Sequence, residues 1–280
     1  MNAIERYNKW LYFDPKTQAE LLKIENTAEI EDRFYKELDF GTGGIRGLMG
    51  AGTNRINTYT IRKISSGLVD YLKNIYGPTP SVVIAYDVRN QSRQFAEDAA
   101  GVFTAKGLDV FMFEEPTPTP VLSFAVEYLK ASAGIVITAS HNPKEYNGYK
   151  IYNHKGVQIV PREAQILNRF INFTYNVDFI PFLTMEESEE SNGINWLDDE
   201  ILEIFLEKVR KLSLYKGDVS ITYTPLHGTG FLSIQKIYLG YLERLHKSYY
   251  FLTNFANSFI SFFSSNSSPS AKIATFAPRE

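Results

Sequence analysis

The sequence predicts an α/β fold in which helices cover both faces of a mainly parallel, mixed sheet. Short apolar, β-branched runs alternate with longer segments of helical periodicity between residues 61 and 137. Such alternation is typical of parallel strands joined by crossover helices. Residues 150–160, interrupted by His154-Lys155-Gly156, have the pattern of a hairpin. They therefore predict an antiparallel addition at one edge of the sheet.

The predicted elements follow one another closely along the chain. Hydrophobic periodicity indicates helices at residues 61–76, 92–106 and 121–129, and strands at residues 81–86, 109–113 and 134–137. Gly77-Pro78 ends the first helix and Gly107 ends the second. Residues 116–120, in which proline and threonine alternate, predict a stiff connector before the third helix.

A short acidic segment marks the expected domain boundary. Residues 185–193 contain four glutamates and no apolar residue after Met185. We therefore expect a first domain at residues 1–184, a linker at 185–196 and a partial second α/β domain at 197–240. The second domain is expected to begin with a helix at 197–212, a strand at 219–223 and a turn at 225–230.

Residues 241–280 differ in composition from the rest of the chain. No charged residue occurs between Ser248 and Ala271, where Phe, Ser and Asn dominate. The segment is too short and too polar for a membrane span, which needs about 20 predominantly apolar residues. We expect a divergent, poorly ordered tail that arises near Gly240 from a premature end or a change of reading frame. Because the tail and the partial second domain would expose apolar surface, we also expect self-association or low solubility.

The composition indicates a globular protein without a general affinity for polyanions. The 280 residues are 44% hydrophobic and have a net charge of −3, so neither nucleic acid nor a membrane is expected as a partner. The absence of cysteine excludes disulfides, thiol catalysis and thiolate metal sites. The first seven residues lack the apolar core of a signal peptide, so the expected location is cytoplasmic.

Residues 138–150, T-A-S-H-N-P-K-E-Y-N-G-Y-K, form the first candidate site. They follow a predicted buried strand, so Ser140 is expected at the carboxyl end of that strand, where open α/β folds place ligands. Lys150 follows ten residues later. These residues alone are also compatible with Ser140 as an exposed turn serine, His141 as a partner of the local backbone, and Lys150 as a surface cation.

Residues 40–47, F-G-T-G-G-I-R-G, form the second candidate site. Clustered glycines let backbone N–H groups converge on an anion, and a guanidinium can add a bidentate grip. The candidate phosphate-binding residues are Thr42, Gly43, Gly44 and Arg46. A glycine cluster by itself is more often an ordinary turn. Two further arginines, Arg89 and Arg93, are interpreted as helix-start charges, with phosphate binding as the minority alternative.

These motifs together resemble the α-D-phosphohexomutases, the phosphoglucomutase and phosphomannomutase superfamily. The segment around Ser140 resembles the family's phosphoserine loop, G-T-G-G-I-R-G resembles its first motif, and T-P-L-H-G-T-G at 224–230 resembles the opening of its second domain. The three motifs occur in family order over roughly 190 residues, which is far more specific than any one of them. The first motif and the long segment before it look more like the phosphoglucomutase and phosphopentomutase branch.

The resemblance implies an intramolecular phosphotransferase that interconverts sugar 1-phosphates and 6-phosphates, or pentose equivalents, through a phosphoserine and a bisphosphorylated sugar. Ser140 would be the phosphoryl carrier. Lys150 would be the general base and acid, its pKa lowered by cations such as Arg46. His141 would contact the phosphoryl group or share the proton transfer, and Arg46 would hold phosphate. The implied partner is a sugar phosphate, and the implied cofactors are Mg²⁺ and a sugar bisphosphate activator.

Parts of the complete family pattern are missing from this sequence. The family has four domains, with an Asp-x-Asp-x-Asp-Arg magnesium loop, a sugar-reading loop and a distal phosphate loop, and none of these loops occurs here. The expected metal ligand is therefore Ser140 through its phosphate only, without carboxylates. The alternative function is a catalytically incomplete mutase fragment. A serine hydrolase is poorly supported, because Gly-x-Ser-x-Gly is absent and adjacent Ser140 and His141 are badly placed for proton transfer.

Overall fold

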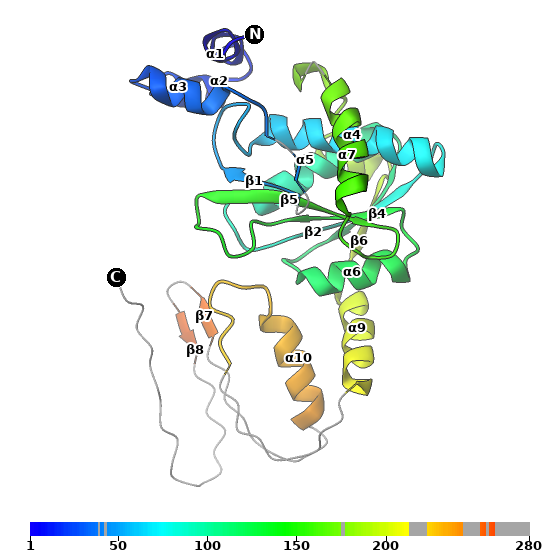
Figure 1. The fold of residues 1–280 in the computed structure, drawn as a ribbon. Coiled ribbons are helices and arrows are strands. Elements are labelled where there is room, and N and C mark those ends of the chain that lie inside the picture. The colour runs from blue at the N-terminus through cyan, green and yellow to red at the C-terminus, as the bar shows by residue number, and fades with distance from the viewer. Residues whose placement is uncertain are drawn as a thin grey trace. The chain divides into compact units, whose positions relative to one another are not determined.

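The computed structural model describes residues 1–38, 40–41, 44–174, 177–212, 223–242, 253–255 and 258–260. The chain divides into two compact units. The first comprises Met1–Ser213 with His227–Gly230, and the second comprises Leu214–Leu226 with Phe231–Glu280. The first unit contains the sheet, the helices that cover it and the candidate site (Figure 1).

The sheet of the first unit has six strands in the order β1-β5-β4-β2-β3-β6. Strands β4, β2, β3 and β6 run parallel to one another, whereas β5 pairs antiparallel with both β4 and β1. The predicted mixed, mainly parallel sheet is thus confirmed, with its antiparallel strands at one edge. The bounds are β1 Ile45–Leu48, β2 Ser81–Tyr86, β3 Asp109–Phe113, β4 Ala133–Ile137, β5 Tyr146–Asn153 and β6 Ile194–Leu197.

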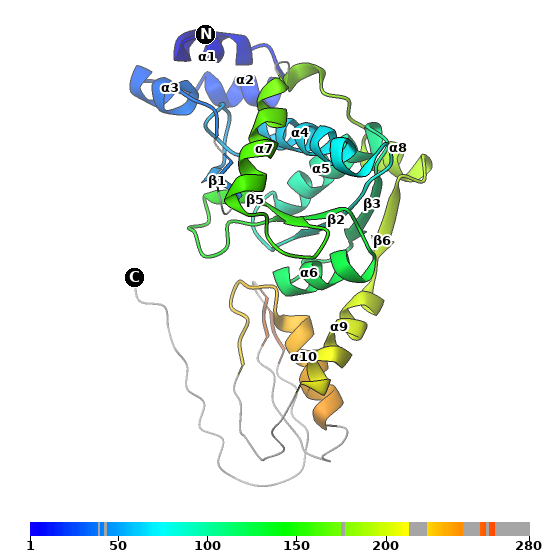
Figure 2. The same ribbon diagram turned by 45° about the vertical axis from the view of Figure 1, so that its right-hand side comes forward.

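Helices cover both faces of the sheet, as the sequence predicts. Helices α4 (Thr58–Tyr76), α5 (Ser92–Ala105) and α7 (Pro161–Phe173) lie on one face, and α6 (Thr119–Tyr128) lies on the other (Figures 1 and 2). Helix α4 begins three residues before its predicted start because the side chain of Asn57 caps it by accepting the Thr60 N–H. Its end at Gly77 agrees with the prediction.

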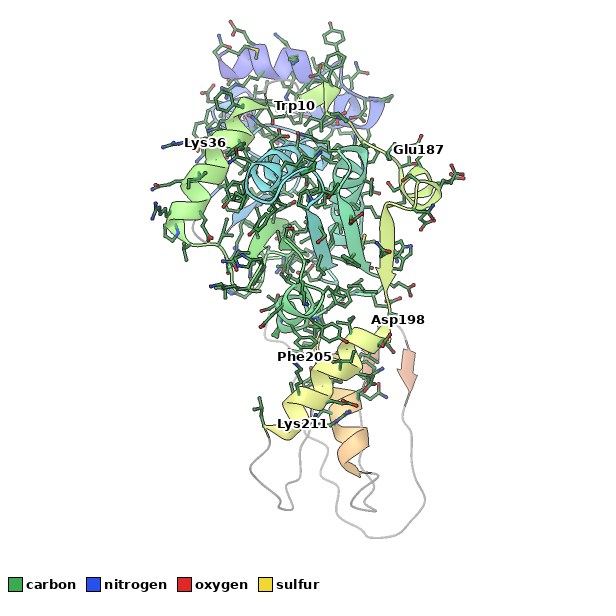
Figure 3. The ribbon with its side chains drawn as sticks, turned by 90° about the vertical axis from the view of Figure 1, so that its right-hand side faces the viewer. Trp10, Lys36, Glu187, Asp198, Phe205 and Lys211 are labelled. Carbon is green, nitrogen blue, oxygen red and sulfur yellow. The ribbon has the colours of Figure 1, made fainter. Side chains whose placement is uncertain are left out.

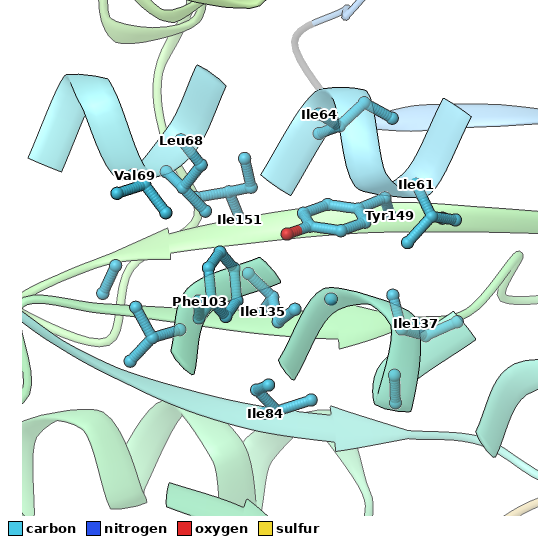
Figure 4. Close-up of a cluster of buried hydrophobic side chains, with 14 of the residues drawn as sticks. Ile61, Ile64, Leu68, Val69, Ile84, Phe103, Ile135, Ile137, Tyr149 and Ile151 are labelled. Carbon is cyan, nitrogen blue, oxygen red and sulfur yellow. The ribbon is translucent and has the colours of Figure 1, made fainter. Parts of the chain in front are cut away.

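The main hydrophobic core lies between the sheet and the face covered by α4, α5 and α7. Figure 4 shows Ile61, Ile64 and Leu68 of α4 above Ile135 and Ile137 of β4, all of them buried. Strands β2 and β4 are buried on both faces, which is why they read as continuous apolar runs rather than alternating ones.

Three N-terminal helices form a smaller core of their own. Helices α1 (Ala3–Trp10), α2 (Pro15–Leu21) and α3 (Thr27–Phe34) pack around Trp10, Leu21 and Phe34. Trp10, labelled in Figure 3, meets Tyr59 of α4 edge-on, with their ring centroids 5.3 Å apart. This contact joins the N-terminal helices to the sheet domain.

The acidic segment expected as a linker at residues 185–196 contains a helix and most of a strand. Helix α8 (Met185–Glu190) is capped by Thr184, and β6 pairs with β3 along the edge of the sheet. Helix α9 (Asp199–Lys211) is capped by Asp198, and the ring of its Phe205 (labelled in Figure 3) contacts that of Phe124 of α6 at a tilt of 50°. The segment therefore differs from the expected connector, because a cap and strand pairing order it despite its polarity. The division at residue 184 stays a prediction.

The described part of the second unit consists of helix α10 (Phe231–Leu242) and the antiparallel strands β7 (Thr253–Phe255) and β8 (Ser258–Ile260). The strand predicted at 219–223 and the tail predicted at 241–280 fall largely outside the described residues. A short 3₁₀ turn, η1 (Val177–Phe179), follows α7 in the first unit. Within the described ranges, no helix combines the length and the apolar character that crossing a membrane requires.

Candidate functional site

Ser140 lies in the turn that follows β4, here named the serine loop (residues 138–145). Its side chain is exposed, and its backbone is left-handed, with φ of 59°. The Asn142 N–H closes the turn by donating to the Ala139 carbonyl at 3.1 Å. A left-handed conformation costs a non-glycine residue about 1–2 kcal/mol, so the surrounding contacts must hold Ser140 in place.

The backbone N–H of Ser140 is held by a chain of side chains that leads to β2. It donates to Thr138 Oγ1 at 2.9 Å, and this hydroxyl donates in turn to Asp87 Oδ2 at 2.6 Å. Asp87 follows β2 directly, and its Oδ1 accepts from the Ser92 hydroxyl at 2.6 Å. Because β2 and β4 are parallel neighbours, the residues after each strand meet at the same edge of the sheet.

Arg89 binds the backbone of the serine loop through four carbonyl oxygens. Its Nη2 donates to the carbonyls of Ser140 at 2.9 Å and Asn142 at 2.6 Å. Its Nη1 donates to those of Pro143 at 2.8 Å and Tyr146 at 3.1 Å. The interpretation of Arg89 as a helix-start charge was therefore wrong. Its partners lie on a loop more than 50 positions later in the sequence, so only the pairing of β2 with β4 could have indicated them.

Arg93 differs from Arg89 although only four positions separate them. Its Nε lies 3.0 Å from Glu97 Oε1, one turn further along α5, and its side chain is largely exposed. This is the arrangement expected of a helix-start charge.

Strand β5 brings Lys150 and Arg46 to one face of the sheet. Arg46 of β1 is opposite Gly148, and Lys150 is two positions further along β5, so the two side chains share a face. The neighbouring Tyr149 points into the core between α4 and the sheet (Figure 4), so Lys150 lies on the opposite face. Arg46 also reaches the serine loop, where its Nη1 donates to Asn142 Oδ1 at 3.4 Å.

The environment of Lys150 favours its neutral form. Partial burial lowers the pKa of its amino group, and the positive charge of Arg46 lowers this pKa further. The negative charge of Asp87 opposes the two effects without cancelling them. The expected direction of the pKa is therefore observed, but the largest cause is burial rather than the neighbouring arginine.

The glycine-rich segment passes directly against β5. Gly44 has φ of +93°, and a Cβ built on it would lie 2.3 Å from the Tyr149 carbonyl oxygen and 3.0 Å from the Lys150 Cα. Its N–H donates to the Gly41 carbonyl at 3.1 Å, and the predicted phosphate contact of Gly44 stays a prediction. Thr42 and Gly43 lie outside the described residues, so their predicted phosphate contacts stay predictions.

The two side chains expected to meet the phosphoryl group are accessible. Ser140 and His141 are both exposed, and neither the hydroxyl nor the imidazole has a hydrogen bond to a described residue. The local backbone bond considered as an alternative for His141 is therefore not formed with the described part of the chain. An exposed hydroxyl and imidazole, with a guanidinium and an amine nearby, can receive an anionic ligand.

The described residues do not fit a complete magnesium site. No group of three or more His, Asp or Glu side chains among them is arranged to hold a metal ion. The carboxylate next to the serine loop, Asp87, already accepts hydrogen bonds from the hydroxyls of Thr138 and Ser92 and pairs with Arg89. Mg²⁺ prefers several oxygen ligands at short distance, and a phosphate on Ser140 would provide only some of them.

Comparisons with known proteins agree with the fold and the motifs. A family profile described as "Phosphoglucomutase/phosphomannomutase, alpha/beta/alpha domain I" matches residues 37–176. The phosphoglucomutase of Staphylococcus haemolyticus (strain JCSC1435) is 38% identical over 226 residues, which cover 80% of this chain and 41% of that protein. The phosphoglucomutase of Staphylococcus saprophyticus is 39% identical over 198 residues, which cover 70% of this chain and 36% of that protein. The chain thus spans roughly two-fifths of these curated relatives.

A solved structure supports the fold independently. The crystal structure of a phosphoglucomutase/phosphomannomutase family protein from Burkholderia thailandensis superimposes with a TM-score of 0.55 at 21% sequence identity. The match covers 71% of this chain and 41% of that one.

Proposed function

Because the chain belongs to the phosphoglucomutase/phosphomannomutase family, we propose that Ser140 accepts a phosphoryl group from a sugar phosphate and returns it to another hydroxyl of the same sugar. The reaction interconverts sugar 1-phosphates and 6-phosphates, or pentose equivalents. The proposal is supported by the exposed Ser140 in a loop that Arg46 reaches through Asn142, and by Lys150, whose pKa burial and Arg46 lower.

In the proposed transfer, a sugar hydroxyl attacks the phosphorus of phosphorylated Ser140. The bond between phosphorus and Ser140 Oγ breaks, the departing Oγ takes up a proton from His141 or from solvent, and a bisphosphorylated sugar forms. Lys150 takes the proton of the attacking hydroxyl, for which its lowered pKa is suited. After the sugar turns over, Ser140 Oγ gives up its proton and attacks the other phosphate. The bond between that phosphorus and the sugar oxygen breaks, and Lys150 returns its proton to this oxygen.

The remaining residues bind and neutralise charge. Arg46, together with Thr42 and Gly43, holds the phosphate oxygens, while His141 contacts the transferring group or shares the proton transfer. A sugar bisphosphate supplies the first phosphate to Ser140. Mg²⁺, when bound in this family, neutralises phosphoryl charge, and Ser140 could ligate it only through a phosphate.

A second candidate function is favoured because the described residues include no group of carboxylates arranged to bind Mg²⁺. If the described residues cannot hold a metal ion, this chain would take up phosphate on Ser140 without completing turnover. It would then act as the phosphoryl-carrying part of a mutase.

The test is phosphate uptake by the purified chain. The chain is incubated with glucose 1,6-bisphosphate and Mg²⁺, and its intact mass and the modified peptide are determined. Conversion of glucose 1-phosphate to glucose 6-phosphate is then measured. Ser140→Ala removes the carrier, and Ser191→Ala, at another exposed serine of the first unit, is the matched control.

We expect one phosphate on Ser140 in the wild type and in Ser191→Ala, and none in Ser140→Ala. Turnover that disappears in Ser140→Ala supports the mutase, whereas phosphate on Ser140 without turnover supports the second candidate. Absence of phosphate from Ser140 rejects both functions.

A further inference from the structure

The connection between β2 and α5, here named the Asp87–Ser92 loop, contacts both elements of the site. We propose that this loop positions Ser140 and Lys150 relative to one another, with Arg89 as its principal positioning residue. The inference rests on the proposed function, because it assigns a role to the geometry around the phosphoryl carrier.

Both backbone polar groups of Ser140 are tied to this loop. The N–H is held by Thr138, whose hydroxyl donates to Asp87, and the C=O is held by Arg89. These two contacts restrain the peptide on each side of a residue whose φ is 59°. Because left-handed backbone persists only when its surroundings over-determine it, Asp87 and Arg89 set the direction in which the Ser140 side chain leaves the chain.

The same loop holds the start of the strand that contains Lys150. The side chain of Asn147 is buried, and its Nδ2 donates to the Asn90 carbonyl at 3.2 Å and to the Ser92 hydroxyl at 3.0 Å. Its Oδ1 accepts the Gly148 N–H at 2.8 Å. Lys150 is three residues further along β5, so the carrier and the proposed base are fixed to one common loop.

The terminal nitrogens of Arg89 have no donor left for a phosphate. Its two terminal nitrogens make four hydrogen bonds to carbonyls, and its Nε lies 3.3 Å from Asp87 Oδ2. A guanidinium has five N–H donors, and the four on its terminal nitrogens are used by these carbonyls. The Arg89 side chain is only 14% exposed, and Asp87 balances its charge. Its role is therefore to position the loop, in contrast to exposed Arg46.

The test compares Arg89→Lys with Arg93→Lys in the full chain. Lysine keeps the charge but cannot bridge four carbonyls from a single nitrogen. Arg93 provides the matched control because, among the described residues, its guanidinium pairs with Glu97 on its own helix and not with the serine loop. Two quantities are measured: amide hydrogen exchange of residues 138–146, with α4 as internal reference, and the rate of Ser140 phosphorylation at increasing concentrations of glucose 1,6-bisphosphate.

In Arg89→Lys we expect exchange of the serine loop to accelerate about tenfold or more, with exchange of α4 unchanged. We expect the maximal phosphorylation rate to fall about tenfold or more, because small misplacements of reacting groups are costly. The half-saturating concentration should stay the same, since Arg89 does not contact phosphate. Arg93→Lys should match the wild type in each measurement.

The proposal is overturned if serine-loop exchange in Arg89→Lys equals that in Arg93→Lys. It is also overturned if the half-saturating concentration rises while the maximal rate is kept, because Arg89 would then bind the phosphate. Should Arg89→Lys fail to fold, Asp87→Asn removes the ion pair at nearly constant shape and is judged by the same exchange criterion. A wild type that takes no phosphate defeats the proposed function, while hydrogen exchange still decides the role of the loop.

Discussion

The charge state of Lys150 is set by its burial and by two charged neighbours. Burial and Arg46 lower its pKa, and Asp87 raises it. The neutral amine is therefore populated at a lower pH than for a solvated lysine. This matters for the proposed function because only the neutral amine can take a proton from a sugar hydroxyl.

We predict that Arg46→Gln raises the pKa of Lys150. Removing a nearby positive charge makes the ammonium form less costly, so the amino group titrates at higher pH. Arg46→Lys keeps the charge and should leave the titration nearer to that of the wild type. The measurement is an NMR titration of ¹³C-methylated lysines, with Lys150 assigned through Lys150→Arg. If Arg46→Gln and the wild type titrate together, the two side chains do not interact.

Replacing Gly44 or Gly77 by alanine allows the cost of backbone strain to be distinguished from the cost of a steric clash. Their φ angles are nearly equal, +93° and +90°, but a Cβ on Gly44 would strike β5, whereas a Cβ on Gly77 would meet nothing within 4 Å. We predict that Gly77→Ala lowers the free energy of unfolding by about 1–3 kcal/mol through backbone strain alone, because its φ of 90° with ψ of −164° is a region that essentially only glycine adopts. Gly44→Ala should cost about 1–3 kcal/mol more. Urea unfolding of both variants tests this prediction. Equal losses of unfolding free energy would show that β5 can move away from the added Cβ without destabilising the protein.

At the scale of elements, Gly67 allows α4 and α7 to approach closely. A Cβ at this position would lie 2.6 Å from the Cα of Ile171. Glycine to alanine in an open helix interior normally stabilises a protein by about 0.5–1 kcal/mol. Here we predict that Gly67→Ala destabilises the protein by about 1–3 kcal/mol, because the helices must separate. Asn74→Ala, at an exposed position of α4, is the control in thermal unfolding. Stabilisation by Gly67→Ala would contradict this packing.

Elements that bury apolar side chains were predictable from the sequence, and elements ordered by polar contacts were not. The strands at 81–86 and 109–113 were predicted at their observed bounds because they are β-branched and apolar. Helix α8 and strand β6 were missed, because α8 is short and acidic and β6 has only four residues. Helix α8 is ordered by the local Thr184 cap, and β6 is ordered by pairing with β3, which is a contact across the sequence.

At the scale of the whole molecule, strand order determines which residues reach the site. Ser140 and Lys150 were recognisable because they lie within one motif. Arg89 was not, because its contact with the serine loop requires β2 and β4 to be neighbours while β3 lies beyond β2. The sequence contains the strands but not their order. Residues that support a site from an adjacent strand are therefore harder to predict than those within a motif.

The extent of the sheet domain gives the last prediction. Residues 1–213 include β6 and α9, whereas residues 1–184 would leave the outer edge of β3 unpaired and remove the Ser188 hydroxyl that lies 2.8 Å from Thr104 Oγ1. We predict that the chain 1–213 unfolds cooperatively in urea and elutes as a monomer. The chain 1–184 should be less stable and should associate, because an open edge strand pairs with other chains. Equal stability and a monomeric 1–184 chain would place the domain boundary at residue 184 after all, with β6 only an accessory strand.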